Sequence, residues 1–348
     1  MNLYESPSGH IVLLDIPSSI SSPPGLALCS TSPPETPYNP PTPKATLPGT
    51  LDGLQCSLTE ALEHVRKNYI GPYLRPRIVD MGDYIGELDF HANTSFLQPP
   101  SSLEFATLSP DVPMSDISDI FSVPISSQFD MWKTLTVSHP APAKLFHIPP
   151  RASFLLSNVQ SSVPAFLSVS DQLERFHFIV LDPPWPNKSA LRSRSYSTFT
   201  RFEFKDLLLL PVDRALVAGR QGGIDPGGLV GIWITNKPSI RKFVLEELFP
   251  SWGLEEVGEW VWLKVTTNGE PVVGFGAQHR KPYESLLFGR RPATRGGKNI
   301  SPSGKAGSDE NEAARLPSKS ILAVPDIHSR KPCIKGIYSS VLPPFSLA

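Results

Sequence analysis

Cysteine is scarce in this chain, which has only three among its 348 residues. Cys29, Cys56 and Cys333 lie far apart in the sequence and form no CxxC pair. The sequence therefore predicts neither a zinc site nor a disulfide framework, and we expect no metal cofactor. Cysteines spaced in this way are typical of a protein that works in a reducing compartment.

Long apolar runs are also missing. No stretch of about 18 consecutive apolar residues occurs, so no membrane span is expected. Residues 1–18 lack the basic flank and the apolar run of a signal peptide. Together these absences indicate a soluble intracellular protein with no membrane partner.

Two common catalytic motifs are absent. The chain has no phosphate-binding loop and no nucleophile-elbow serine, which argues against a kinase or a hydrolase. The short run Gly274-Phe275-Gly276 does not open a helix after a strand, so it does not indicate a nucleotide loop. The net charge is only -1. Any contact with nucleic acid must therefore come from local basic patches.

Proline, by contrast, is abundant and unevenly distributed. The chain has 39 prolines, and residues 17–50 are dense in Pro, Ser and Thr. Such a segment cannot bury enough apolar surface to offset its chain entropy. We therefore predict a disordered Pro/Ser-rich tail over residues 1–56.

Residues 57–150 are predicted to form a small accessory region with low-complexity stretches. A helix is expected near its start, because Ser57 and Glu60 have the spacing of a capping box. Four apolar residues share one face of this helix, namely Leu58, Ala61, Leu62 and Val65. Residues 92–127 are again rich in Ser and Pro.

From about residue 151 apolar strand patterns alternate with helical ones. Strands are expected over residues 153–159, 176–181, 229–235, 254–265 and 283–289, and helices over residues 202–210 and 238–248. This alternation is typical of an open α/β sheet. We assign the catalytic domain to residues 151–335, with a polar loop over 291–317 and a divergent tail over 336–348.

The run Asp182-Pro183-Pro184-Trp185 follows the apolar strand 176–181. In open α/β sheets, ligands bind at the carboxyl ends of the strands. An exocyclic amino group is a poor nucleophile, because its lone pair is delocalised into the ring. A site that alkylates it needs acceptors for its hydrogens. The Asp182 carboxylate and a backbone carbonyl held rigidly by the two prolines are such acceptors.

Trp185 has two interpretations. Its flat ring can stack on a base that has been lifted out of its strand, or it can serve only as a packing element. Trp233, Trp260 and Trp262 lie within strands, so we interpret them as packing residues.

Several blocks resemble one known family. They are DPPWPNKS at 182–189, IWITNK at 232–237, FVLEELFPSWG at 243–253, EWVWLK at 259–264, HRKPYESLLFG at 279–289 and HSRKP at 328–332. In their order and spacing they resemble the MT-A70 family of adenine methyltransferases, and within it the methyltransferase-like protein 4 branch. The resemblance implies a Rossmann-like sheet with circularly permuted motifs that depends on S-adenosylmethionine. It also implies methylation of the adenine N(6) amino group in RNA or DNA. The location expected is the nucleus, with the cytoplasm as a further location.

The resemblance also implies roles for particular residues. Asp182, Pro183 and Trp185 hold the target adenine, next to Pro184. Three residues on the following active-site loops contact the substrate, namely Asn187, Lys188 and Tyr196. Cofactor-binding residues are Asp182, together with Asn158 and Glu284. Asn158 stands where the branch tends to place an aspartate. Glu284 either orients a ligand or pairs with Arg280 or Lys281.

Local basic clusters support nucleic acid as the partner. They comprise Lys188, Arg192, Arg194 and Arg201, then Arg280, Lys281, Arg290, Arg291, Arg295 and Lys298, then Arg330, Lys331 and Lys335. A solvated basic face is the alternative interpretation.

The chain departs from the family after the HSRKP block. The family continues with a strand similar to Glu-Leu-Phe-Ala-Arg and a Gly-Asn-Glu turn, which bind the cofactor. Here Ile334–Tyr338 follows, and residues 341–345 do not resemble that strand. We therefore expect this chain to bind S-adenosylmethionine weakly or not at all and to have little activity. Two alternatives to an active enzyme are a non-catalytic partner of the same fold and a piece of a longer product.

Overall fold

The computed structural model describes most of the predicted catalytic domain and parts of the N-terminal half. The described residues are 2–20, 28–38, 52–79, 106–107, 114–116, 124–126, 131–139, 144–155, 159, 163, 175–185, 203–217, 227–277, 280–291, 315–327 and 330–338. No helix among them is long and apolar enough to cross a membrane.

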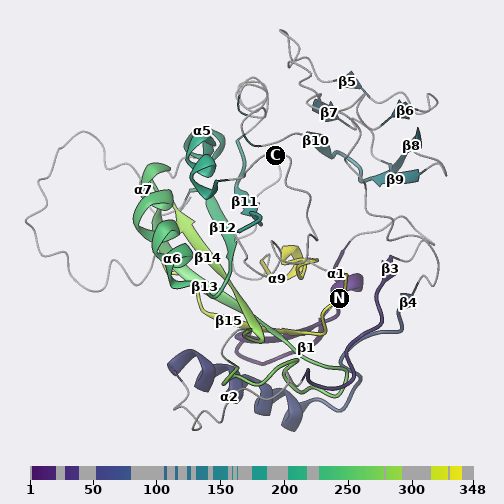
Figure 1. The fold of residues 1–348 in the computed structure, drawn as a ribbon, viewed down its shortest axis with the longest axis vertical. Helices are drawn as coiled ribbons and strands as arrows, with labels where there is room; N and C mark the ends of the chain where they lie inside the picture. The colour runs from purple at the N-terminus through teal and green to yellow at the C-terminus, as the bar shows by residue number, and fades with distance from the viewer. Residues whose placement is uncertain are drawn as a thin grey trace, which may run out of the picture.

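A seven-stranded mixed sheet forms the centre of the molecule (Figure 1), in the order β1-β2-β15-β13-β14-β12-β11. The strands are β1 (Asn2–Glu5), β2 (Ile11–Leu14), β15 (Lys319–Ala323), β13 (Glu255–Lys264), β14 (Tyr283–Arg290), β12 (Leu229–Ile234) and β11 (Phe178–Leu181). Strand β14 runs antiparallel to β12 and β13, whereas β11 is parallel to β12, and β15 is parallel to β13 and β2. Five strands therefore end at one edge of the sheet, where β14 begins. This result confirms the predicted α/β fold.

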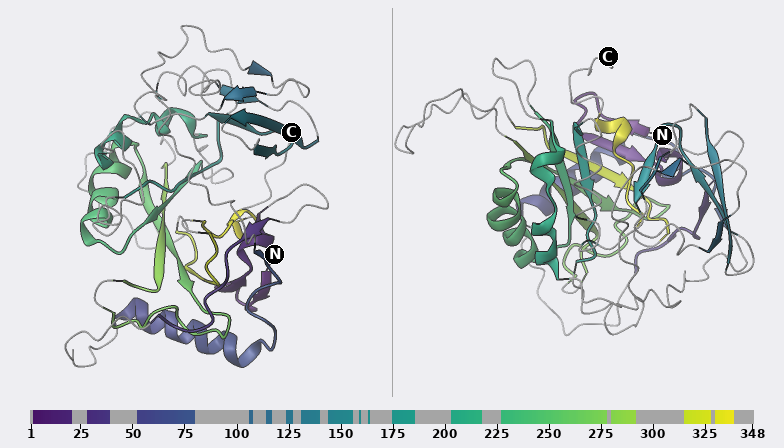
Figure 2. Two further views of the ribbon diagram at one scale, coloured as in Figure 1. Left: turned by 45° about the vertical axis from the view of Figure 1, so that its right-hand side comes forward. Right: turned by 90° about the horizontal axis from the view of Figure 1, so that it is seen from above.

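Helices cover both faces of this sheet (Figure 2). One face carries α5 (Val212–Ala215), α6 (Pro238–Phe243), the π-helical turn η3 (Val244–Leu248) and α7 (Phe249–Ser251). The same face carries α2 (Gly53–Asn68), which lies over β2, β15 and β13. The other face carries α1 (Ile16–Ser19) and α9 (Lys335–Tyr338). Because both faces are covered, all six residues of β12 are buried.

Strand β13 shows how alternating side chains supply the two faces. Trp260 and Trp262 pack in the cluster on the side of α1 and α9, whereas Val261 and Leu263 pack on the side of α2. Trp233 on β12 joins the two tryptophans. The prediction that these three indoles are packing residues is confirmed, since all are buried.

Helix α2 has the buried face that the sequence predicted, but it begins earlier. Its four predicted apolar residues are all buried. The expected capping box at Ser57 is wrong, because Asp52 is the N-cap and accepts a hydrogen bond from the backbone of Gln55 at 2.8 Å. Since the helix packs on Leu13 of β2 and Val261 of β13, it belongs to the core of the sheet and not to a separate accessory region.

The predicted disordered tail is wrong for residues 2–20. These residues form β1, β2 and α1, and β2 pairs in parallel with β15. Within the apolar run Ile11–Leu14, residues 12–14 become buried because the strand finds partners at the opposite end of the sequence. Within the predicted tail, residues 21–27 and 39–51 lie outside the described residues.

Two further assignments near the C-terminus need correction. Strand β15 was not predicted, although it is buried in the middle of the sheet. The tail predicted over 336–348 begins too early, because Ile337 on α9 is 1% exposed and packs in the core. Short apolar segments of this kind gain their order from neighbouring strands and helices and not from their own periodicity.

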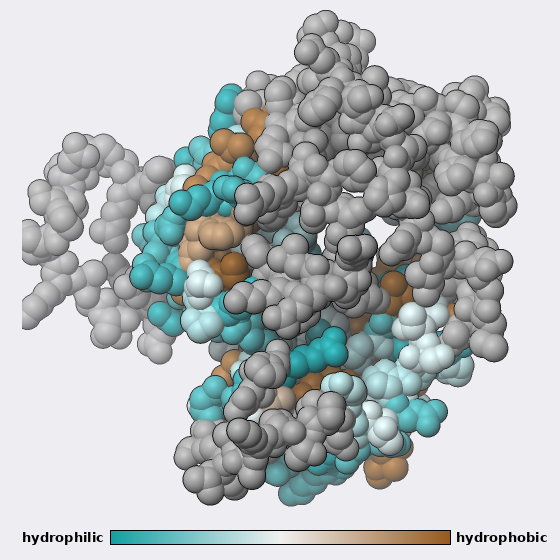
Figure 3. Space-filling view, viewed as in Figure 1, coloured by the Kyte–Doolittle hydropathy of each residue, from teal (hydrophilic) through white to brown (hydrophobic). Residues whose placement is uncertain are grey.

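The remaining described elements are short. Strand β10 (Ser153–Leu155) pairs with β7 (Pro124–Ser126), which pairs with β5 (Ala106–Thr107). The described start of the strand predicted over 153–159 therefore lies outside the central sheet. The others are β3 (Cys29–Ser30), β4 (Ile78–Val79), β6 (Met114–Asp116), β8 (Lys133–His139), β9 (Lys144–Ile148) and the 3-10 helix η2 (Phe204–Leu209). On the face seen in Figure 3, brown apolar residues are visible among teal polar ones.

Leu13→Ala tests whether β2 is an integral strand. Leu13 is fully buried between the sheet and α2, so we expect a loss of about 2–5 kcal/mol in the free energy of unfolding, measured by urea denaturation. Leu209→Ala, at an exposed leucine of η2, is the control and is expected to change stability by less than about 0.5 kcal/mol. Equal stabilities of the two variants would mean that the N-terminal strand is dispensable.

Candidate active site

Four charged side chains meet at the edge where the parallel strands end. Asp182 follows β11, Lys264 ends β13, Glu284 lies at the start of β14, and Lys331 comes shortly after β15. Lys331 Nζ lies 3.1 Å from Asp182 Oδ2 and 3.3 Å from Glu284 Oε2. Lys264 forms a second ion pair with Glu284. Two carboxylates and two ammonium groups therefore form one continuous network.

The two carboxyl groups differ in their electrostatic environment. Burial would raise the pKa of Glu284, but the ammonium groups of Lys264 and Lys331 outweigh this effect and lower it. For Asp182, partial burial is the dominant effect and raises its pKa, while Lys331 opposes the rise. Because the Asp182 side chain is 40% exposed, its carboxylate is the accessible acceptor of the pair.

The proline pair forms a tight turn after β11. The backbone N–H of Trp185 donates to the carbonyl oxygen of Pro183 at 2.8 Å. Pro183 is buried and Pro184 is exposed. The Pro183 carbonyl, one candidate for the predicted backbone acceptor, thus already accepts one hydrogen bond within the turn. A carbonyl oxygen has a second lone pair, so it can accept another hydrogen bond from a substrate.

Trp185 is packed into the core. Its side chain belongs to the cluster beneath α5 and α6, only 8% of the residue is exposed, and its indole N–H donates to the Trp233 carbonyl at 2.6 Å. The ring thereby anchors the turn after β11 to the end of β12. This geometry supports the packing interpretation for the described conformation, whereas stacking on a base stays a prediction.

Two residues after β12 complete this edge. Asn236 Nδ2 donates to the backbone carbonyl of Tyr283 at 2.6 Å, which joins the end of β12 to the start of β14. The Thr235 hydroxyl oxygen is buried and has no hydrogen-bond partner among the described residues. A buried polar atom without a partner is costly, so this hydroxyl offers a contact for a ligand.

The structure tests only part of the predicted site. It brings Asp182 and Glu284 together through Lys331. Four predicted residues lie outside the described residues, namely Asn158, Asn187, Lys188 and Tyr196. Their proposed roles stay predictions.

Sequence reasoning missed Lys264 and Lys331 as site residues. Both lie in blocks that carried the family resemblance. Lys264 is the last residue of EWVWLK, and Lys331 lies within HSRKP. The signal available was the position of Lys264 at a strand end, on the same edge as the motif. Of the two roles left open for Glu284, pairing with Lys281 is not seen, since Lys281 donates to the Phe275 carbonyl at 2.8 Å and Glu284 pairs with Lys264 and Lys331. Its role as a ligand contact stays a prediction.

Three side chains of the last two basic clusters have a structural use that the charge pattern did not indicate. Arg330 pairs with Asp326, and Lys331 pairs with two carboxylates. Arg291 donates to the backbone carbonyl of Asp213 at 3.0 Å. These side chains are held within the chain, so they are poor candidates for phosphate contacts.

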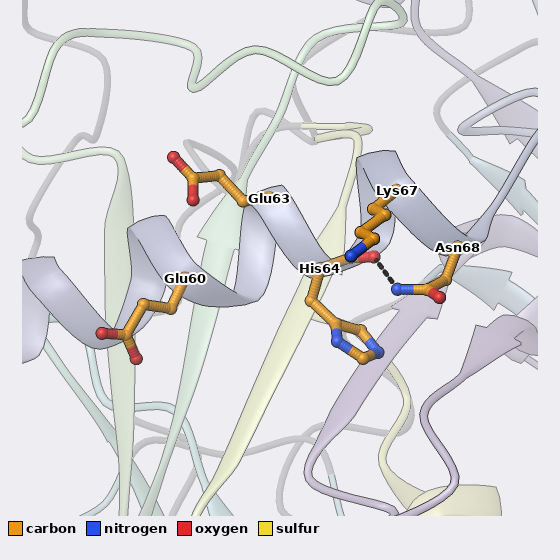
Figure 4. A pocket seen from close by; sticks show the side chains of 5 residues that line it. All are labelled: Glu60, Glu63, His64, Lys67 and Asn68. Atoms are coloured by element: carbon orange, nitrogen blue, oxygen red, sulfur yellow. Dashed lines mark hydrogen bonds between the residues drawn. The ribbon is translucent and has the colours of Figure 1, made fainter.

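A shallow depression on α2 has a different character (Figure 4). It is lined by Glu60, Glu63, His64, Lys67 and Asn68, all from one helix. None of these residues belongs to the strand-end network. Among the described residues no group of three or more His, Cys, Asp or Glu side chains could hold a metal ion.

Substitutions at Trp185 separate packing from stacking. Trp185→Ala is expected to lower the free energy of unfolding by about 3–5 kcal/mol, because it empties a buried site. Trp185→Phe keeps most of the packing but leaves the Trp233 carbonyl without its donor, at a cost of about 1–3 kcal/mol. Thermal denaturation and oligonucleotide binding are measured on both variants. Weaker base binding with unchanged stability would contradict the packing role.

Comparison with known proteins places this edge in a family context. The sequence pattern of the MT-A70 family matches residues 176–343, which include the proline turn, Lys264, Glu284 and Lys331. Over 383 aligned residues the chain is 32% identical to the N6-methyladenosine RNA methyltransferase MTA1 of Pyricularia oryzae, covering 99% of this chain and 88% of that protein.

Two other relatives give a similar result. The chain is 29% identical to the N6-methyladenosine RNA methyltransferase MTA1 of Cryphonectria parasitica, over 98% of this chain and 84% of that protein. It is 31% identical to the human N(6)-adenine-specific methyltransferase METTL4, over 65% of this chain and 43% of that protein. With the motif, the α/β sheet and a relative matched over nearly its whole length, the chain belongs to the MT-A70 family.

Proposed function

We propose that this chain transfers a methyl group to the N(6) amino group of adenine in RNA. The observation that carries the proposal is the accessible Asp182 carboxylate, held at the carboxyl edge of the sheet by the proline turn and beside the Lys331 ammonium group. RNA is favoured over DNA because the two relatives matched over nearly the whole chain are named RNA methyltransferases.

The chemistry follows from the acceptors at this edge. Asp182 and the Pro183 carbonyl accept the two amino hydrogens, which draws the nitrogen lone pair out of the ring and toward the methyl group. The Lys331 ammonium opposes the effect of burial on Asp182 and so favours the ionised, accepting form. The methylated amine loses its extra proton after transfer, so a strong general base is not required.

S-adenosylmethionine is the methyl donor in this proposal, and it would supply an electrophilic methyl group on a sulfonium. The residues present fit such a molecule in charge. Two carboxylates and two ammonium groups can oppose both charges of its methionine end, and the buried Thr235 hydroxyl has no partner among the described residues. Asp182 and Glu284 are the described residues predicted to hold it, and Asn158 remains the third predicted contact.

The direct test is methyl transfer by the purified chain. The chain is incubated with isotope-labelled S-adenosylmethionine and single-stranded RNA that contains adenine, and the nucleosides are separated by mass spectrometry. Labelled N6-methyladenosine is the expected product. A DNA strand of the same sequence distinguishes the DNA alternative, and an RNA without adenine is the blank. Failure to methylate either adenine-containing strand would contradict the proposal.

Asp182 is expected to be essential for transfer but not for folding. Asp182→Ala removes a charged acceptor at the reacting group, which is expected to lower kcat about a hundredfold or more. Glu246→Gln, at a surface carboxylate that pairs only weakly with Lys242 at 3.7 Å, is the matched control. Near-normal turnover of the Ala variant would contradict the role of Asp182.

The difference in stability between the wild type and an Asp182→Asn variant is predicted to depend on pH. Because the fold raises the pKa of Asp182, the folded chain binds this proton more tightly than the unfolded chain. The associated stability is present below the unfolded pKa and is lost as pH rises through the folded pKa. As pH rises from the unfolded pKa of Asp182 to its folded pKa, the wild type is therefore expected to lose stability relative to Asp182→Asn. Urea titrations at each pH measure this difference. The opposite trend would contradict the assigned direction.

A nucleic-acid-binding partner without catalysis is the second candidate function. Among the described residues β11 is an edge strand of the sheet, and Val180 on this strand is 44% exposed. No described strand therefore covers the outer edge of β11, the strand that leads into the proline turn. Calorimetric titration with S-adenosylmethionine distinguishes the two functions. Low-micromolar binding favours the enzyme, whereas absent binding with retained affinity for RNA favours the partner role.

A further inference from the structure

Arg77 and Asp326 form a buried ion pair close to the segment that carries Lys331. Their side chains are 3% and 0% exposed, and Arg77 Nη1 lies 3.8 Å from Asp326 Oδ1. The guanidinium also donates to the carbonyl oxygens of Val324 at 3.0 Å and Pro325 at 2.7 Å, where the chain leaves β15. Arg77 therefore fixes the carboxyl end of this strand.

Asp326 has two further partners. Its Oδ1 accepts a hydrogen bond from the backbone N–H of Thr31 at 3.1 Å, and its Oδ2 pairs with Arg330. Arg330 directly precedes Lys331. Removing one member of a buried ion pair leaves the other charge without compensation, which is strongly unfavourable. The cluster thus favours one arrangement of the chain that leads to Lys331.

The segment behind this lysine is also held by N-terminal residues. The backbone N–H of Cys333 donates to Ser19 Oγ at 3.1 Å. Ile334 and Ile337 are buried and pack in the same cluster as Ile16. The lysine therefore lies between two anchors, and both involve residues from the first 80 of the chain.

We propose that Arg77 is a positioning residue for the reaction. Through Asp326 and Arg330 it holds the Lys331 ammonium group beside Asp182. Arg77 lies well before the part of the chain that the family pattern matches, so the N-terminal region contributes to the arrangement of the active site. The kinetic tests of this inference rest on the proposed function, whereas a chemical labelling test does not.

The kinetic test compares two Arg77 variants with a matched control in the full chain. Arg77→Met is expected to lower kcat/KM about ten- to a hundredfold, because a small displacement of a site residue has effects of this size. Arg77→Lys, which keeps the charge but loses the fork geometry, is expected to lie between it and the wild type. Arg241→Met removes another arginine–carboxylate pair, with Glu259, and is expected to leave kcat/KM unchanged.

The pH profile distinguishes positioning from a general loss of stability. Among the described residues, the charged groups that face Asp182 are Lys331, Glu284 and Lys264. Without the Lys331 ammonium group, burial raises the pKa of Asp182 with less opposition. The acidic limb of the kcat/KM profile is therefore expected to move to higher pH in Lys331→Met. Arg77→Met is expected to move this limb in the same direction, and the double variant no further than Lys331→Met alone. An unshifted limb, or fully additive effects, would overturn the inference.

Competitive acetylation of lysines, read by mass spectrometry, needs no enzyme activity. Arg77→Met is expected to increase labelling of Lys331, and Arg241→Met is not.

Lys319, which is 5% exposed, reports on folding and should stay protected. If Lys319 becomes labelled in Arg77→Met, that variant has unfolded and Arg77→Lys supplies the comparison. Unchanged Lys331 labelling in the folded Arg77 variant overturns positioning. Selective labelling in a chain that transfers no methyl group supports positioning and contradicts the proposed function.

Discussion

The pairing of β15 with β2 on one side and β13 on the other is the interaction on which the arrangement of the molecule depends. A strand of five residues cannot remain ordered alone. Between two parallel neighbours its apolar residues reach both faces of the sheet and its backbone groups find partners. Because β15 ends at the same edge as β11, β12 and β13, the chain that follows it reaches the proline turn. The charged network at that edge is a consequence of this pairing.

The network itself is balanced in charge. Burying single charges at the end of a sheet would be costly, but here each carboxylate lies within an ion pair. Glu284 is the better compensated of the two, since it contacts two ammonium groups, and Asp182 is the more exposed. Two similar side chains therefore differ in their surroundings. The Glu284 carboxylate pairs with both lysines, whereas the Asp182 carboxylate pairs with Lys331 and is the more accessible.

The sequence predicted the elements that carry their own signal. Strands β12, β13 and β14 are six to ten residues long and rich in apolar residues. Asp182-Pro183-Pro184-Trp185 could be assigned to a strand end because an apolar strand precedes it. Strands β2 and β15 were missed, because each is short and has its partners in distant parts of the chain. Lys331 was missed as a site residue for the same reason. Its position depends on Arg77 and Asp326, and no local pattern relates an arginine to an aspartate so far along the chain.

The pairing of β2 with β15 also has a consequence for synthesis of the protein. Val12 lies opposite Ile321, so two segments from almost opposite ends of the sequence become neighbours. Contacts between such distant residues form slowly, because a long loop must close first. During translation the apolar run Ile11–Leu14 leaves the ribosome long before its partner strand exists. A nascent chain therefore carries an unpaired apolar strand through most of its synthesis, and this interval is when chaperone binding would protect it from aggregation.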